Sequence, residues 1–102
     1  MTEIHGGPER EQVKELTDTA SGVWRVFTRD SSHTFDMDDR TVLRSPGKLA
    51  TNFGLVLPTR LDYIGTCQVG KRGSWFFAPL DPVTEPHEYL SSTVQRIERL
   101  DV

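Results

Sequence analysis

The residues of this chain whose types and spacing could do chemistry are cations beside an aromatic run. Residues 70–73 read Gly-Lys-Arg-Gly and are followed by Ser-Trp-Phe-Phe. Cations between glycines at a hairpin tip can contact phosphates, and an aromatic strand can stack nucleic-acid bases. A solvated turn followed by a strand with core-facing aromatic side chains is the simpler interpretation. The candidate binding residues of this basic segment are Arg40, Arg44, Lys48, Lys71, Arg72 and Trp75.

Formal charge is distributed unevenly along the sequence. The whole chain carries −3, yet residues 40–80 hold six cations and a single acid. Residues 1–18 and 81–102 each hold five acids and two cations. Either the acidic ends neutralise the basic middle when the strands pair, or the basic middle forms a patch for an anionic partner. Neutralisation is the simpler of these two interpretations.

No arrangement typical of an enzyme is visible. Cys67 is the only cysteine, and its place within an apolar strand favours a buried structural thiol over a nucleophile. The three histidines do not have metal-binding spacing. The acidic cluster of Asp36, Asp38 and Asp39 has the spacing that starts a calcium loop, but the later glycine and glutamate are missing. We therefore expect no enzyme activity, no cofactor and no metal site.

The elements that position these residues are predicted to be β-strands. Short β-branched and aromatic runs with alternating side chains follow Gly22, and turn residues separate them. The first connections are too short for a crossover helix, so we expect antiparallel pairing. The pattern predicts a mainly β fold, a small antiparallel barrel or roll of about five to six strands. The predicted strands cover residues 23–28, 32–38, 40–44, 60–69, 74–78 and 93–100.

The two ends of the chain are harder to assign. After Pro8, acids and a thin apolar stripe at helical spacing predict a short N-terminal helix over residues 9–20. Residues 88–102 combine helical spacing with serines and threonine that disfavour a helix, and within them we favour a strand over residues 93–100. The predicted domains are a tail with a short helix (1–21) and a single small β domain (22–102).

Strict alternation within residues 60–69 assigns side chains to faces. It places Leu61 and Tyr63 on one face of the strand and Ile64 on the other. Gly65 in the middle of this run indicates a bulge or a bend.

The order of these segments resembles a known group of proteins. Residues 32–47 combine a short polar strand, an Asp-x-Asp turn, an Arg-Thr-Val strand and Pro-Gly, and residues 65–70 end in Cys-x-Val-Gly. A last strand begins at Thr93 with Thr-Val-Gln-Arg-Ile. Over residues 22–100 the chain resembles small uncharacterised proteins of high-GC Gram-positive bacteria and of their phages. The resemblance implies no activity, but it supports a strand for the final segment.

Composition limits the class of protein further. With 102 residues, 35% of them hydrophobic and 26% charged, the chain fits one globular domain. No apolar run approaches the ~20 residues of a membrane span, and a single cysteine excludes a disulfide scaffold. The first seven residues contain no apolar core, so we expect no signal peptide and a cytoplasmic location.

These observations favour a non-catalytic interaction or adaptor domain. We expect it to bind a protein partner, or a second copy of itself, through exposed strand edges and surplus aromatic side chains. The alternative is nucleic-acid or anion binding through residues 40–80. An enzyme is the least favoured class, because no acid, base and nucleophile occur together in the pattern.

Overall fold

The computed structural model of this chain describes residues 10–46, 57–79, 83 and 85–101. It is built from β-strands, and no residue in these ranges is helical. The predicted mainly β fold of about five to six strands is therefore confirmed, with six antiparallel strands, and the predicted N-terminal helix is wrong. The strands are β1 (Val23–Thr28), β2 (Ser31–Asp36), β3 (Thr41–Pro46), β4 (Thr59–Thr66), β5 (Arg72–Phe77) and β6 (His87–Arg99).

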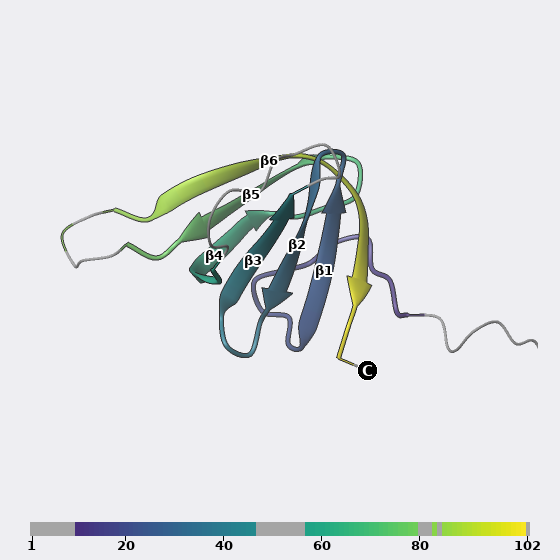
Figure 1. The fold of residues 1–102 in the computed structure, drawn as a ribbon, viewed down its shortest axis with the longest axis horizontal. Coiled ribbons are helices and arrows are strands. Elements are labelled where there is room, and N and C mark those ends of the chain that lie inside the picture. Colours follow the sequence, from purple (N-terminus) through teal and green to yellow (C-terminus); the bar gives the residue numbers. More distant parts are fainter. Residues whose placement is uncertain (1–9, 47–56, 80–82, 84, 102) are drawn as a thin grey trace, which may run out of the picture.

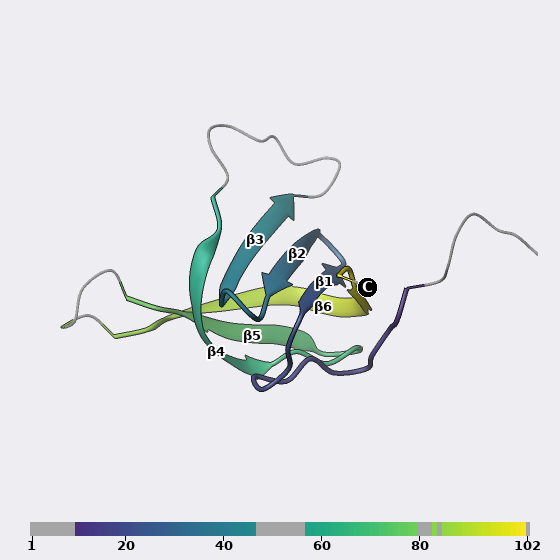
Figure 2. The same ribbon diagram turned by 90° about the horizontal axis from the view of Figure 1, so that it is seen from below.

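The strands pair in chain order and the last returns to the first. All pairings are antiparallel, and β1 lies between β2 and β6, which is the strand order of a closed barrel. Figures 1 and 2 show this arrangement, with β5 and β6 running out together beyond the other strands. The ring is weakest between β3 and β4, where only Thr41 with Arg60 and Val42 with Thr59 are in register.

The N-terminal segment is an extended strap instead of a helix. Val13 donates its amide to the carbonyl of Ile97 at 3.1 Å, and Leu16 donates to the carbonyl of Cys67 at 2.9 Å. The side chain of Leu16 is buried among the core residues. A helix with so thin an apolar stripe has little area with which to dock, whereas these sheet edges satisfy the backbone of an extended chain. We call residues 10–20 the N-terminal strap.

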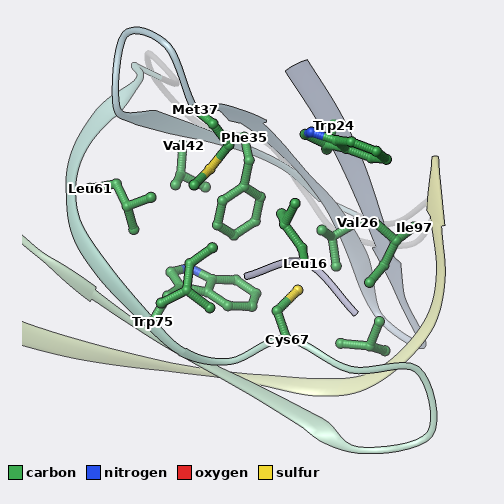
Figure 3. Packing of buried hydrophobic residues seen from close by; sticks show 12 residues of the cluster. Leu16, Trp24, Val26, Phe35, Met37, Val42, Leu61, Cys67, Trp75 and Ile97 are labelled. Carbon is green, nitrogen blue, oxygen red and sulfur yellow. The ribbon is translucent and has the colours of Figure 1, made fainter. Parts of the chain in front are cut away.

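The core lies inside the ring of strands and is centred on Trp75. Burial alternates along β1, as its sequence predicts. Trp75 is fully buried and meets the ring of Phe35 edge-on at 4.9 Å between centroids (Figure 3). A Cβ at Gly73 would overlap the Trp75 ring, so this glycine permits the close packing. The buried apolar residues are Leu16, Trp24, Val26, Phe35, Met37, Val42, Leu61, Ile64, Cys67, Trp75, Val94 and Ile97.

The face assignment predicted for β4 is wrong at Tyr63. Leu61 and Ile64 both face the core, whereas Tyr63 is exposed and stacks on Phe76 outside the sheet, with ring centroids 4.4 Å apart. The register against β5 shifts on both sides of this pair, between Leu61 and Tyr63 and again across Gly65. At each irregularity β4 has one more residue than β5 opposite it. The side chains beyond that point therefore change face, and strict alternation fails. The irregularity predicted at Gly65 is confirmed.

Strand β6 answers the question left open for residues 88–102. It is a strand of 13 residues, longer than predicted, and no single neighbour covers its whole length. Residues 87–93 pair with β5 and residues 94–99 pair with β1. Where β6 runs on past β5, the N-terminal strap takes the place of a strand through the bridge of Gln12 with Glu98.

Within the described ranges, no helix of the length and apolarity needed to cross a bilayer occurs.

Candidate functional site

One stretch of β6 has an edge to which no described strand is paired. Strand β1 ends at Thr28, opposite Val94, so β6 continues alone on that side. The β1–β2 turn then caps the next positions, because Arg29 donates its amide to the carbonyl of Thr93 at 3.0 Å. Asp30 donates its amide to the Ser92 hydroxyl at 3.1 Å. We call the remaining residues, 87–91 of β6, the open edge.

The backbone groups that face the open edge follow from strand alternation. The amide of Gly73 points toward β6, where it donates to a serine hydroxyl at 2.9 Å. Trp75, two residues further along β5, therefore also points its backbone toward β6, and its register partner is Tyr89. Glu88 and Leu90, on either side of Tyr89, then direct their N–H and C=O groups to the open edge.

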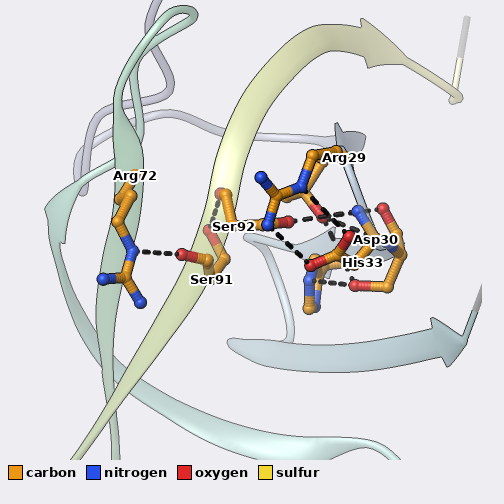
Figure 4. A network of polar contacts seen from close by, with 8 residues as sticks. Arg29, Asp30, His33, Arg72, Ser91 and Ser92 are labelled. Atoms are coloured by element: carbon orange, nitrogen blue, oxygen red, sulfur yellow. Dashed lines mark hydrogen bonds and ion pairs between the residues drawn. The ribbon is translucent and has the colours of Figure 1, made fainter.

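A polar groove lies beside the open edge. Its volume is about 450 Å³. Hydroxyl groups and three guanidinium groups dominate its walls, and Figure 4 shows part of the network. Arg29, Arg44 and Arg72 against the single acid Asp30 leave the lining with a formal charge of +2. We call it the arginine groove; it is lined by Arg29, Asp30, Ser31, Arg44, Arg72, Tyr89, Leu90, Ser91, Ser92 and Thr93.

The three arginines of this groove differ in what they already bind. Arg29 pairs with Asp30 at 3.2 Å, and its hydrogen bond lowers the pKa of that carboxyl. Arg72 approaches β6 from the β5 side and donates to the carbonyl of Ser91 at 2.9 Å (Figure 4). Arg44 makes no side-chain hydrogen bond or ion pair with any residue that the structure describes. The groove therefore offers two cations that form no ion pair with a described carboxylate, although the charge of Arg44 also acts on Asp30.

A smaller, largely apolar pocket opens next to the arginine groove. Its volume is about 190 Å³, and it lies where β3 and β4 separate. Arg44 and Tyr89 line both this pocket and the arginine groove, so the two are contiguous. We call it the mouth pocket; it is lined by His33, Val42, Arg44, Leu57, Thr59, Phe77 and Tyr89.

His33 forms part of the floor of this region. Its side chain is almost fully buried, with its Nε2 atom 3.1 Å from the Ser31 hydroxyl. The imidazole ring lies edge-on to Trp75 and to Tyr89, at 5.0 and 5.4 Å between centroids. Burial, with a smaller contribution from the charge of Arg44, lowers the pKa of His33 to about 4. The ring is therefore neutral at pH 7 and serves here as a packed, hydrogen-bonded group.

The predicted binding residues do not form one surface. Arg44 and Arg72 meet at the arginine groove. Arg40 lies on the β2–β3 turn and is bound to the strap and to β4. Its guanidinium donates to the Asp18 carboxylate at 2.9 Å and to the carbonyl of Asp62 at 2.7 Å. Arg40 also has a φ of 59°, a left-handed backbone that this turn requires.

The other three predicted binding residues lie elsewhere. Trp75 is fully buried, which leaves no ring face for a ligand. Lys71 is exposed on the β4–β5 connection and does not line the groove. Lys48 lies outside the described residues. Partial neutralisation of the basic segment, the simpler interpretation of the charge pattern, is observed at Arg40.

Sequence reasoning missed several residues of the site. Arg29 lies between two predicted strands, in residues 19–39, where two cations stand against four acids for a net charge of −2. For Ser91 and Ser92 the sequence indicates only a low helix propensity. Their role depends on β6 being longer than β1, and only strand register reveals that difference.

Neither the thiol of Cys67 nor a cluster of metal-ligating side chains forms a reactive centre in the described part of the chain. Burial raises the pKa of the Cys67 thiol to about 12, so it carries no thiolate at neutral pH. The described histidine, cysteine and acidic residues nowhere gather in threes that could hold a metal ion.

Comparisons with protein-family models, with curated proteins and with solved structures gave no match to this chain. The resemblance to small proteins of high-GC Gram-positive bacteria and their phages stays a prediction.

Proposed function

We propose that this protein is a non-catalytic interaction domain that binds an extended segment of a partner protein as an added strand on β6. The observation that carries the proposal is the open edge: residues 87–91 pair with β5 on one side and with no described strand on the other. An unpaired edge presents a row of backbone donors and acceptors that an extended peptide can satisfy.

The two ends of β6 differ in how their backbone edges are covered, and this difference supports a functional role for the open edge. The C-terminal end is covered by the N-terminal strap, which donates and accepts backbone hydrogen bonds there. The N-terminal end instead borders a groove of about 450 Å³ and exposes the side chain of Leu90. Proteins usually cover or blunt such edges, so an edge beside a groove fits a binding surface.

A partner protein is favoured over a second copy of this chain. Two copies joined edge to edge at β6 would face each other across a two-fold axis. That arrangement would bring Arg44 and Arg72 of both copies toward one interface, and each groove already carries +2. Like charges brought together in this way oppose association.

Nucleic-acid binding is the second candidate, and Arg44 and Arg72 support it because they flank one groove. Two other observations weaken it. Trp75, the predicted stacking residue, is buried, and Arg40 is already bound to Asp18. Tyr89, an aromatic residue that lines the groove, is half-buried and packs against Trp75, so it offers less stacking surface than single-strand binding uses.

The test selects binders from a library of randomised twelve-residue peptides displayed on phage, with the full chain as bait. Leu90→Pro removes a backbone donor from the open edge without breaking pairing to β5, so the variant is expected to fold. Leu90→Ala is the matched control, because it removes the same side chain and keeps the amide. We expect selected peptides to bind the Leu90→Ala protein and to lose at least tenfold in affinity for Leu90→Pro.

Equal affinity for the two variants would contradict strand addition, and so would a library from which no peptide is enriched. Dimerisation that Leu90→Pro abolishes would show that the occupant is a second copy. The proposal involves no cofactor and no membrane, and it assigns the protein to the cytoplasm.

A further inference from the structure

We infer that the segment bound at the open edge carries a carboxylate side chain two residues from a bulky apolar side chain. The inference rests on the proposed strand addition and specifies its ligand. Arg44 would receive the carboxylate, and the mouth pocket would receive the apolar side chain.

The charge requirement comes from the arginine groove. Arg44 has no described hydrogen-bond or ion-pair partner, and Arg72 binds only a neutral carbonyl. A guanidinium group presents paired N–H donors that match a carboxylate. The Ser92 hydroxyl lines the same groove, accepts from the Asp30 amide and keeps its own proton, so it can donate to the second carboxylate oxygen.

A carboxylate fits this groove better than a phosphate. Asp30 lines the groove and keeps its negative charge, because the hydrogen bond from Arg29 lowers the pKa of its carboxyl. Arg29 is therefore already paired, and Arg72 donates to the carbonyl of Ser91. Arg44 is thus the cation among the described groove residues without a hydrogen-bond partner. One such cation matches the single charge of a carboxylate.

The apolar requirement comes from the mouth pocket. Its volume of about 190 Å³ exceeds the roughly 150 Å³ in which an apolar cavity holds a benzene molecule. Val42, Phe77 and Leu57 provide apolar walls, and the side chain of Leu57 is exposed. One aliphatic or aromatic side chain would cover this surface.

The spacing of two residues follows from the geometry of an added strand. Alternate side chains of a strand project from the same face, about 6.6 Å apart at 3.3 Å per residue. Tyr89 lies on β6 at the boundary between the groove and the pocket, and Arg44 lines both. Two side chains that lie two residues apart on the core-facing side of the added strand would therefore reach both cavities, one the arginine groove and the other the mouth pocket.

The experiment uses the peptides selected from the randomised library. We expect them to share an aspartate or glutamate two positions from a leucine, isoleucine, phenylalanine or methionine. Arg44→Gln should weaken such a peptide at least tenfold and leave its version with glutamine in place of the acid unchanged. Arg60→Gln is the matched control, since it removes an equal charge from an exposed position on β4 outside both cavities.

The apolar contact is tested with Leu57→Ser, which makes the pocket wall polar without disturbing the buried core. This change should weaken the peptide with the apolar side chain at least fivefold more than the same peptide with alanine.

The outcomes separate this inference from the proposed function. Selected peptides that depend on the Leu90 amide but show no acid at this spacing would overturn the inference and keep strand addition. An equal loss of affinity in Arg44→Gln and Arg60→Gln would also overturn it, because it would indicate general charge attraction. A phosphoserine peptide that binds over tenfold tighter than its glutamate counterpart would reassign the groove to phosphate.

Discussion

At the scale of single residues, His33 is a titratable group whose side chain is almost fully buried. The unfolded chain takes up a proton there near the ordinary pKa of 6.5, whereas the folded protein does so only near 4. Protonation therefore favours the unfolded state between these values. Stability is full above about pH 6.5 and falls as the pH is lowered toward 4.

This difference gives a pH-dependent stability with a defined size. The difference between the unfolded and folded pKa of His33 corresponds to roughly 3 kcal/mol of unfolding free energy lost between pH 6.5 and 4. Denaturant unfolding at a series of pH values should show this loss, and His33→Gln should remove most of it while keeping a partner for Ser31. His87→Gln, on the exposed start of β6, should leave the pH profile as it is. Profiles of equal slope for the native protein and His33→Gln would contradict the account.

Cys67 gives a second measurement at this scale. The thiol is buried, and its pKa of about 12 leaves almost no thiolate at neutral pH. A thiol reagent should therefore label the native protein slowly and the unfolded protein fast, with one thiol to count. Fast labelling of the native protein at pH 7 would reopen a catalytic or redox role.

At the scale of elements, the sequence predicts regular strands well and irregular ones poorly. Strands β1 to β3 follow from alternation and short turns, because each side chain obeys a period of two. Tyr63 and Ile64 exchange faces because β4 changes register twice, which alternation does not reveal. The N-terminal strap was predicted as a helix, because its backbone partners on β6 and beyond β4 are distant in sequence. Arg44 and Arg72 of the candidate site were predicted as binding residues. That Arg29 lines the same groove depends on the register of β6, which the sequence does not reveal.

The strap makes a prediction about stability. Leu16 is buried although it lies in a segment with no regular strand of its own. Leu16→Ala should lower the free energy of unfolding by about 2–5 kcal/mol, through lost burial and the cavity left behind. Glu15→Ala, the exposed neighbour, should cost under about 0.5 kcal/mol. Equal losses of unfolding free energy for Leu16→Ala and Glu15→Ala would show that the strap does not close the core.

At the scale of the whole molecule, charge separates the two candidate functions. The net charge is −3, while the arginine groove is locally positive. Nucleic-acid binding releases counterions, so its affinity falls steeply as salt rises. We expect no strong binding to single- or double-stranded oligonucleotides by fluorescence anisotropy at moderate salt. Micromolar binding that Arg44→Gln and Arg72→Gln abolish would reverse the order of the two candidates.

The central claim, that β6 accepts an added strand, is tested most directly by amide hydrogen exchange resolved by residue. In the free protein the amides of Glu88 and Leu90 should exchange fast, and that of Tyr89, which faces β5, should be protected. Saturation with a selected peptide should slow exchange at Glu88 and Leu90 by at least tenfold and leave Tyr89 unchanged. Protection of Glu88 and Leu90 in the free, monomeric protein, or no change when the peptide binds, would contradict the account.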